Sequence, residues 1–203
     1  MEKAMIMQNH STIRCTHTLV VAAVLAAGSF ILAFFEFPIP FSPTFARMDL
    51  SDLPALVGAF AYGPLMGVLI ELIKNLLQLP TTSTGAVGEL ANFLVGSSFV
   101  GIAGLLYRHH RTRKAACLSC LAASVGMGIV AAAVNYFLLL PIFEEFMPLE
   151  QLIASFRQYI PFIQTKLDIV LFNALPFNLL KGLGISFVTR SIYQRLEPIL
   201  RSR

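Results

Sequence analysis

This sequence contains six runs of apolar residues, and each of the longer runs can cross a lipid bilayer as a helix. A membrane-crossing helix needs about 20 mostly apolar residues, because the hydrocarbon core of a bilayer is about 30 Å thick. Over the whole chain 56% of residues are hydrophobic and 13% are charged, whereas a soluble domain has about 25% charged residues. The sequence therefore predicts an all-α integral membrane protein in which residues 1–203 form a single membrane domain. The predicted spans are residues 16–35, 53–62, 64–79, 87–107, 115–140 and 167–189.

Two of these runs, 53–62 and 64–79, are short and are joined by Tyr62-Gly63-Pro64. Glycine followed by proline marks a tight turn, and proline suits the first position of a helix because its missing N–H has no intrahelical partner there. We therefore predict two compact helices in this region, which gives six transmembrane helices in total.

Lysine and arginine gather in alternate connections of this six-helix topology. The two termini and the cluster RHHRTRK at 108–114 share one side of the membrane, and the positive-inside rule assigns that side to the cytoplasm. We therefore predict cytoplasmic N- and C-termini in a multi-pass protein of the plasma membrane. A five- or seven-helix count would place the 108–114 cluster and the C-terminal arginines on opposite sides. The net charge of +4 follows from this topology and does not indicate a nucleic-acid partner.

Polar side chains interrupt the last apolar run in the stretch LFNALPFNLLKG at 171–182. Charged groups within a bilayer cost about 2.5–3.5 kcal/mol each, so such residues indicate function. Phe177, Asn178 and Lys181 fall at i, i+1 and i+4, and α-helical geometry projects them to one side of the helix. Asn135 adds an amide to the fifth span. Asn173 is expected to point elsewhere and to cap backbone groups freed by the nearby proline.

Each of these residues has a structural alternative. Asparagines in spans often only hydrogen-bond neighbouring helices. For Lys181 the alternative is an ion pair with Glu71 or Glu89 that serves packing alone. For the loop 81–84 it is a solvated connection.

Motifs of membrane-bound catalysis are missing from the sequence. It contains no H-E-x-x-H, no G-x-S-x-G and no phosphate-binding G-x-x-x-x-G-K-[ST]. Cys117 and Cys120 lie near two histidines, but no second pair completes a zinc site, and three cysteines indicate no disulfide framework. We predict that the chain is not an enzyme, binds no metal or cofactor and does not hydrolyse ATP by itself.

Three segments carry a family resemblance: DLSDLPALVGAFAYGPLMGVLIELIKNLL at 49–77, GAVGELANFLVG at 85–96, and LFNALPFNLLKG. They resemble the substrate-binding S components of energy-coupling factor (ECF) vitamin transporters. The first segment is typical of S components in general, and the Lys-Asn, GELANF and PFNLLK elements favour the riboflavin-binding type. The resemblance implies six helices with both termini inside and a vitamin pocket that faces outward. It also implies three partners, a transmembrane coupling subunit and two ATP-binding subunits.

Riboflavin, the ligand that the resemblance implies, has a flat ring with a uracil-like edge and a hydroxylated ribityl chain. An amide carries a donor and an acceptor on one plane, so Asn135 and Asn178 are expected to bind the ring edge. Lys181 is expected to donate to ring carbonyls or ribityl oxygens, and aromatic neighbours such as Phe177 to flank the ring. The further candidates are Thr82, Glu89 and Asn92. The first outer loop, 37–47, is expected to supply apolar lid contacts, and 141–162 to form a short amphipathic helix or lid on the same face.

Small residues in the first span form two pairs with a spacing of four, Ala22 with Ala26 and Ala23 with Ala27. Small residues four apart let another helix approach closely. By resemblance these alanines are expected to dock on the coupling subunit, and the alternative is packing within the chain. The alternatives for the whole protein are an S component for another small molecule, a membrane enzyme or a stand-alone channel.

Overall fold

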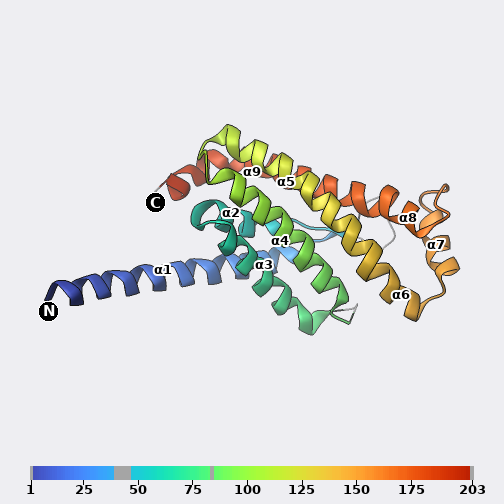
Figure 1. Ribbon diagram of the computed structural model, residues 1–203, viewed down its shortest axis with the longest axis horizontal. Helices are drawn as coiled ribbons and strands as arrows, with labels where there is room; N and C mark the ends of the chain where they lie inside the picture. Colours follow the sequence, from blue (N-terminus) through green and yellow to red (C-terminus); the bar gives the residue numbers. More distant parts are fainter. Residues whose placement is uncertain (1, 39–46, 83–84, 202–203) are drawn as a thin grey trace.

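Apolar helices make up nearly all of the computed structural model, which describes residues 2–38, 47–82 and 85–201 (Figure 1). Four helical stretches are long and apolar enough to cross a membrane, and α2 is apolar but shorter. The only strands in these residues are β1 (Phe37–Pro38) and β2 (Arg47–Met48), which form one antiparallel pair. The predicted all-α class is confirmed apart from this pair. The helices are α1 (Glu2–Ala33), α2 (Asp52–Tyr62), α3 (Pro64–Gln78), the 3-10 turn η1 (Leu79–Thr81), α4 (Val87–Tyr107), α5 (Arg113–Val134), the π turn η2 (Asn135–Leu139), α6 (Leu140–Phe146), α7 (Leu149–Arg157), α8 (Lys166–Ile169), the π turn η3 (Val170–Ala174) and α9 (Leu175–Arg201).

Several of these elements are consecutive parts of one longer helix. α5, η2 and α6 form one helix, Arg113–Phe146, and α8, η3 and α9 form another that begins at Lys166. The described chain therefore contains six main helical rods and the short helix α7. α4 has the predicted bounds, whereas the rod that begins with α5 continues past the predicted end at residue 140.

The two π turns let the long rods continue through prolines. Leu140 N donates to Asn135 O and Leu175 N donates to Val170 O, which are i to i+5 bonds. Pro141 and Pro176 come directly after these two leucines. Proline has no N–H and its ring clashes with the carbonyl four residues earlier in an α-helix, and insertion of a π turn loosens the bonding pattern at that point.

The turn between α2 and α3 has the predicted form. Gly63 has φ +102°, a conformation that favours glycine, and its N–H donates to Ala59 O at 2.9 Å. Pro64 is the first residue of α3. The chain therefore reverses sharply here, and the two compact helices predicted from the sequence are observed.

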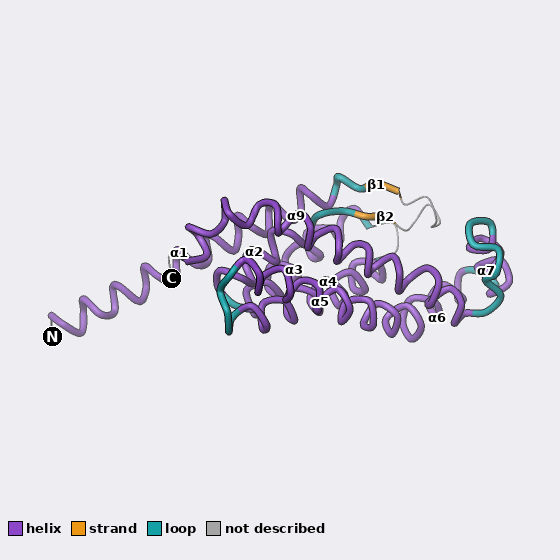
Figure 2. The backbone as a smooth tube through the Cα atoms, turned by 90° about the horizontal axis from the view of Figure 1, so that it is seen from above, coloured by secondary structure: helices purple, strands orange, loops and turns teal. Residues whose placement is uncertain are grey.

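The rods pack as an elongated bundle (Figures 1 and 2). α5 packs against both α4 and α9, and α3 packs against α1, α2 and α4. Both chain termini lie toward the end of the bundle opposite to α7, as the two views show. The far end, near α6 to α8, is therefore separated from the termini by the length of the bundle.

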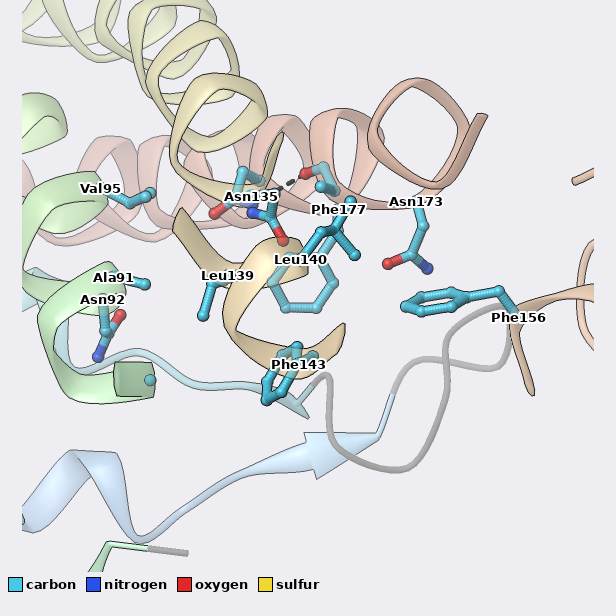
Figure 3. Close-up of a pocket in the computed structure, with 13 residues that line it drawn as sticks. Ala91, Asn92, Val95, Asn135, Leu139, Leu140, Phe143, Phe156, Asn173 and Phe177 are labelled. Carbon is cyan, nitrogen blue, oxygen red and sulfur yellow. Dashed lines mark hydrogen bonds between the residues drawn. The ribbon is translucent and has the colours of Figure 1, made fainter. Parts of the chain in front are cut away.

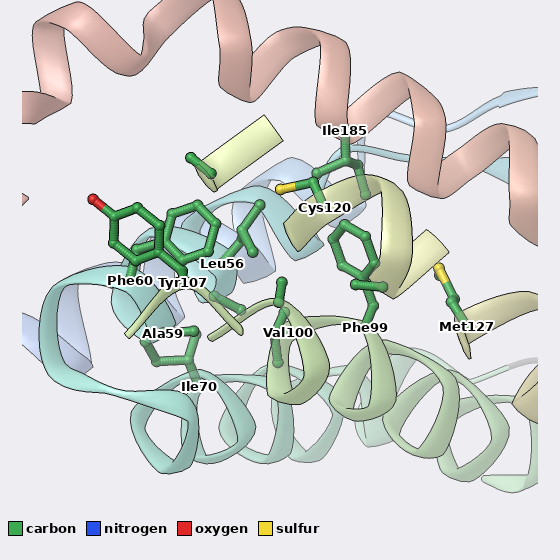
Figure 4. Packing of buried hydrophobic residues seen from close by; sticks show 14 of the residues in the cluster. Leu56, Ala59, Phe60, Ile70, Phe99, Val100, Tyr107, Cys120, Met127 and Ile185 are labelled. Carbon is green, nitrogen blue, oxygen red and sulfur yellow. The ribbon is translucent and has the colours of Figure 1, made fainter. Parts of the chain in front are cut away.

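The main apolar core lies between α2, α3, α4, α5 and α9 (Figure 4). Phe60 and Tyr107 stack with their ring centroids 4.2 Å apart. The hydroxyls of Tyr107 and Tyr193 are 2.8 Å apart in a buried hydrogen bond. Two tyrosine hydroxyls thus satisfy each other within an apolar core and join the end of α4 to α9.

Gly182 is predicted to be required for the close approach of α5 and α9. A Cβ at this position would lie 2.5 Å from Ser124 Oγ and 3.0 Å from Ser124 Cα, whereas a Cβ at Gly184 would meet nothing within 4 Å. We expect Gly182→Ala to lower the free energy of unfolding by about 1–3 kcal/mol through overpacking. Gly184→Ala is the matched control and is expected to raise it by about 0.5–1 kcal/mol, because alanine favours the helix. Thermal unfolding in detergent measures both, and equal shifts would contradict the close contact.

Candidate functional site

A pocket of about 250 Å³ lies at the end of the bundle away from the termini, between α4, the two π turns and the segments that follow them (Figure 3). The helix α7 also reaches it through Phe156. The pocket is lined by Gly88, Ala91, Asn92, Val95, Asn135, Leu139, Leu140, Phe143, Phe156, Asn173, Ala174, Phe177 and Asn178. Both π turns contribute an asparagine to this lining.

The lining combines amides with aromatic rings. It contains four asparagines and three phenylalanines, and no charged residue of the described chain belongs to it. Asn92 lies toward one end of the pocket, and Asn173 and Phe156 lie toward the other (Figure 3). Such a lining suits an uncharged, largely flat ligand with hydrogen-bonding groups spread along its length.

Two of the amides are held by their own helices. Asn135 Nδ2 donates to Ala131 O at 2.8 Å, and Asn178 Nδ2 donates to Ala174 O at 2.9 Å. Each amide keeps its side-chain oxygen and one further N–H. The pocket therefore presents pre-oriented acceptors and donors from two different helices.

The direction predicted for Asn173 is wrong. This residue is 9% exposed and lines the same pocket as Asn178. Asn173 lies within the π turn Val170–Ala174, whose one extra residue changes the rotation that an α-helix would give at this position. The α-helical spacing assumed for the sequence therefore rotated Asn173 away from its actual face.

Helix α7 contributes one residue, Phe156, to the pocket lining. Leu152, Ile153 and Phe156 are buried in a second apolar cluster, which also contains residues of α6, α8 and η3. Arg157 Nε donates to Ile163 O at 2.9 Å, which closes the loop after the helix. The segment expected to be an amphipathic helix or lid thus carries a helix with a pocket-lining phenylalanine. Of the lid predicted from the first outer loop, residues 39–46 lie outside the described residues.

The sequence-predicted residues divide into three groups. Asn92, Asn135, Phe177 and Asn178 line the pocket. Thr82 and Glu89 are not in the lining; Thr82, which precedes α4, donates from Oγ1 to Glu89 Oε2 at 2.8 Å and accepts from Ala86 N at 3.2 Å. Lys181 is not part of the lining, and its ligand role stays a prediction. The residues that sequence reasoning missed are mainly Asn173 and the phenylalanines of α6 and α7.

Lys181 belongs to a buried ionic cluster that we call the Asp52 cluster. Its members are Asp49, Ser51, Asp52, Glu71, Lys74 and Lys181. Lys181 Nζ lies 3.1 Å from Asp52 Oδ2 and 3.5 Å from Asp49 Oδ1. Lys74 Nζ lies 2.8 Å from Asp52 Oδ1 and 2.6 Å from Glu71 Oε2. Asp52 therefore bridges two lysines, one from α3 and one from α9.

The partners of Lys181 differ from those anticipated for an ion pair. The sequence alternative named Glu71 or Glu89, whereas the acids that contact Lys181 are Asp49 and Asp52. The sequence feature that could have identified these two partners is the segment DLSDLP at 49–54, where two acids border an apolar helix. The described residues contain no group of three or more His, Cys, Asp or Glu side chains that could hold a metal ion.

The alanine pairs of α1 face in different directions. Ala22 and Ala26 are 3% and 1% exposed and pack within the chain, whereas Ala23 and Ala27 are exposed. One residue along a helix is a rotation of about 100°, which separates the two pairs. Packing within the chain, stated above as the alternative, therefore applies to Ala22 and Ala26. The prediction that α1 docks on the coupling subunit now concerns Ala23 and Ala27 alone.

Comparison with known proteins identifies the family. A family model described as the substrate-specific component of ECF transporters matches residues 17–193. The chain is an ECF transporter S component. It is 34% identical over 183 residues to the riboflavin transporter RibU of Staphylococcus aureus (strain TCH60), which covers 90% of this chain and 92% of that protein. It is 33% identical over 183 residues to the riboflavin transporter FmnP of Bacillus subtilis (strain 168), which covers 89% of this chain and 92% of that protein.

Solved structures agree with the fold of an S component. A structure described as the S component of a bacterial ECF transporter superposes with a TM-score of 0.74 at 33% identity, covering 92% of this chain and 98% of that chain. ThiT from Listeria monocytogenes gives a TM-score of 0.65 at 16% identity with the same coverage, which shows the fold alone. Since the relatives are named as transporters, the prediction that this chain is not an enzyme is confirmed.

Lys181→Met is predicted to destabilise the ligand-free S component. Removing one partner of a buried ion pair costs about 3–5 kcal/mol, because the other charge is left buried. Lys166→Met is the matched control, since Lys166 pairs with Glu144 at a site that is 30% and 26% exposed. A pair near the surface contributes under about 1 kcal/mol. Thermal unfolding in detergent compares the two, and an unchanged melting temperature for Lys181→Met would contradict the structural role and favour a ligand role.

Proposed function

We propose that this S component captures riboflavin outside the plasma membrane and delivers it inward with ECF partner subunits. The observation that carries the proposal is the pocket lined by four asparagines and three phenylalanines. Two relatives that cover about nine-tenths of the chain are named as riboflavin transporters, which supports the same ligand.

The chemistry of the lining fits the vitamin. The uracil-like edge of the ring has an N–H between two carbonyls. The amides of Asn135 and Asn178 can accept a hydrogen bond from this N–H and donate hydrogen bonds to the carbonyls. The phenylalanine rings can contact the faces and edges of the flat ring system. Riboflavin carries no charge, so a pocket without charged lining residues binds it without desolvating an ionised side chain.

The proposed topology has six membrane-crossing helices with both termini in the cytoplasm. Helices α2 and α3 have 11 and 15 residues, or about 16 and 22 Å at 1.5 Å per residue. They are shorter than the bilayer core and cross it as a packed pair inside the bundle. A cytoplasmic location for this end of the bundle is supported by the basic connection 108–114 and the C-terminal arginines. The pocket, at the other end, then opens outward.

Energy for transport is proposed to come from partner subunits. The sequence has no phosphate-binding loop, and the family implies an ECF module with a transmembrane coupling subunit and ATP-binding subunits. The exposed face of α1 that contains Ala23 and Ala27 also carries Leu19 and Ile31, at 60% and 57% exposure. These four residues are spaced by four, and the small residues at the centre let another helix approach closely.

The function is tested by binding to the purified full chain in detergent. Protein that quenches the fluorescence of added riboflavin, and does not bind thiamine, is the expected result. Within the pocket, Asn178→Ala is expected to weaken riboflavin binding by about 5- to 150-fold, because a polar group of the ligand loses its partner at about 1–3 kcal/mol.

Ser186→Ala is the matched control for Asn178→Ala. Ser186 Oγ donates to Gly182 O at 2.7 Å, so the variant removes the same kind of bond to a carbonyl four residues earlier on α9. Ser186 does not line the pocket, and its variant is expected to keep full affinity. Wild-type protein that does not quench riboflavin would refute the ligand, and equal affinities of the two variants would refute the role of Asn178.

Bulky replacements on α1 test the docking face. Ala23→Trp and Ala27→Trp are expected to abolish co-purification of the coupling and ATP-binding subunits while riboflavin binding persists, because both side chains are exposed. Ala22→Trp and Ala26→Trp are expected to lower the melting temperature of the chain itself, because both positions are buried. Normal partner recovery with Ala23→Trp and Ala27→Trp would place docking on another surface.

A further inference from the structure

A second hollow, of about 450 Å³, lies at the other end of the bundle between the start of α5 and α9. It is lined by Arg113, Lys114, Cys117, Leu118 and Arg190. Three of these five side chains are cationic, and they come from two different helices. The pocket described above shares none of these residues.

Within the part of the chain whose side chains the structure describes, the cations of this hollow have no acidic partner. No ion pair found among the described residues involves Arg113, Lys114 or Arg190. Arg113 Nη2 donates to Arg190 O at 3.2 Å, which joins the two helices and leaves the other guanidinium N–H groups of Arg113 for a ligand. Three exposed cations around one hollow supply the kind of donors that suit an anionic group with several acceptor oxygens, such as a phosphate.

An apolar stripe leads away from the hollow along α5. Leu118, Leu121, Val125 and Ile129 are 66%, 39%, 56% and 62% exposed. Their spacing of three, four and four residues places them on one face of the helix. A free phosphate ion gains nothing from this face, whereas the acyl chains of a phospholipid can lie along it.

The hollow and the pocket are separated along one helix by about the thickness of a bilayer core. Arg113 and the pocket residue Asn135 are 22 positions apart on one continuous helix, or about 33 Å at 1.5 Å per residue. The hydrocarbon core is about 30 Å thick. We propose that this hollow binds the headgroup of an anionic phospholipid, with Lys114 and Arg190 contacting the phosphate and an acyl chain lying on the Leu118 to Ile129 stripe.

The test uses full-length S component in neutral detergent, titrated with phosphatidylglycerol and followed by native mass spectrometry. Lys114→Gln/Arg190→Gln removes two headgroup contacts and keeps Arg113, which joins the helices. Each such contact is worth about 1 kcal/mol, so we expect affinity for phosphatidylglycerol to fall by about 25-fold, or about 2 kcal/mol at 1.4 kcal/mol per tenfold. Arg108→Gln/Arg195→Gln is the matched control, because it removes two exposed charges from the same end of the bundle outside the hollow. We expect this control to bind phosphatidylglycerol like the wild type.

Three results would overturn the proposal. Equal losses in the two double variants would mean general attraction to a basic surface. Displacement of the lipid by inorganic phosphate at matched concentration would mean a phosphate-ion site. Equal binding of phosphatidylcholine and phosphatidylglycerol to the wild-type protein would remove the role of headgroup charge, and this last comparison does not depend on the folding of any variant.

Discussion

The carboxylate of Asp52 is the group on which the arrangement of three helices depends. Asp52 is the first residue of α2, and its carboxylate lies between Lys74 of α3 and Lys181 of α9. All three side chains are at most 5% exposed. An unpaired ion in such a place costs several kcal/mol. Alternative rotations or shifts of these helices would leave at least one charge buried without a partner, so the cluster selects one packing arrangement among the many that apolar surfaces alone would allow.

This constraint reaches the pocket through α9. Lys181 follows Asn178 by three residues, which is less than one helical turn. When Lys181 is held toward α2 and α3 by its ion pairs, the rotation of α9 about its axis is determined, and Phe177 and Asn178 are directed into the pocket. The lysine thus positions the pocket residues without lining the pocket itself.

The two π turns provide the second element of the site. Each precedes a proline, at Pro141 and Pro176, and each places an asparagine in the pocket lining, at Asn135 and Asn173. π turns inside α-helices occur frequently at functional sites. Here the same local change allows a long helix to pass through a proline and contributes an additional amide to the pocket lining.

Local patterns in the sequence were enough to predict the helical membrane class, the turn that separates α2 from α3, the bounds of α4 and four residues that line the pocket. These features follow from the length of apolar runs, the backbone preferences of glycine and proline, and the expense of amides in hydrocarbon, all of which are local. Helix packing was needed to show that Lys181 contacts Asp52, that Asn173 lines the pocket, and that Ala22 is buried while Ala23 is exposed. Each of these depends on the rotation of a helix about its axis and on a neighbour distant in sequence, and the periodicity of one segment does not contain that information.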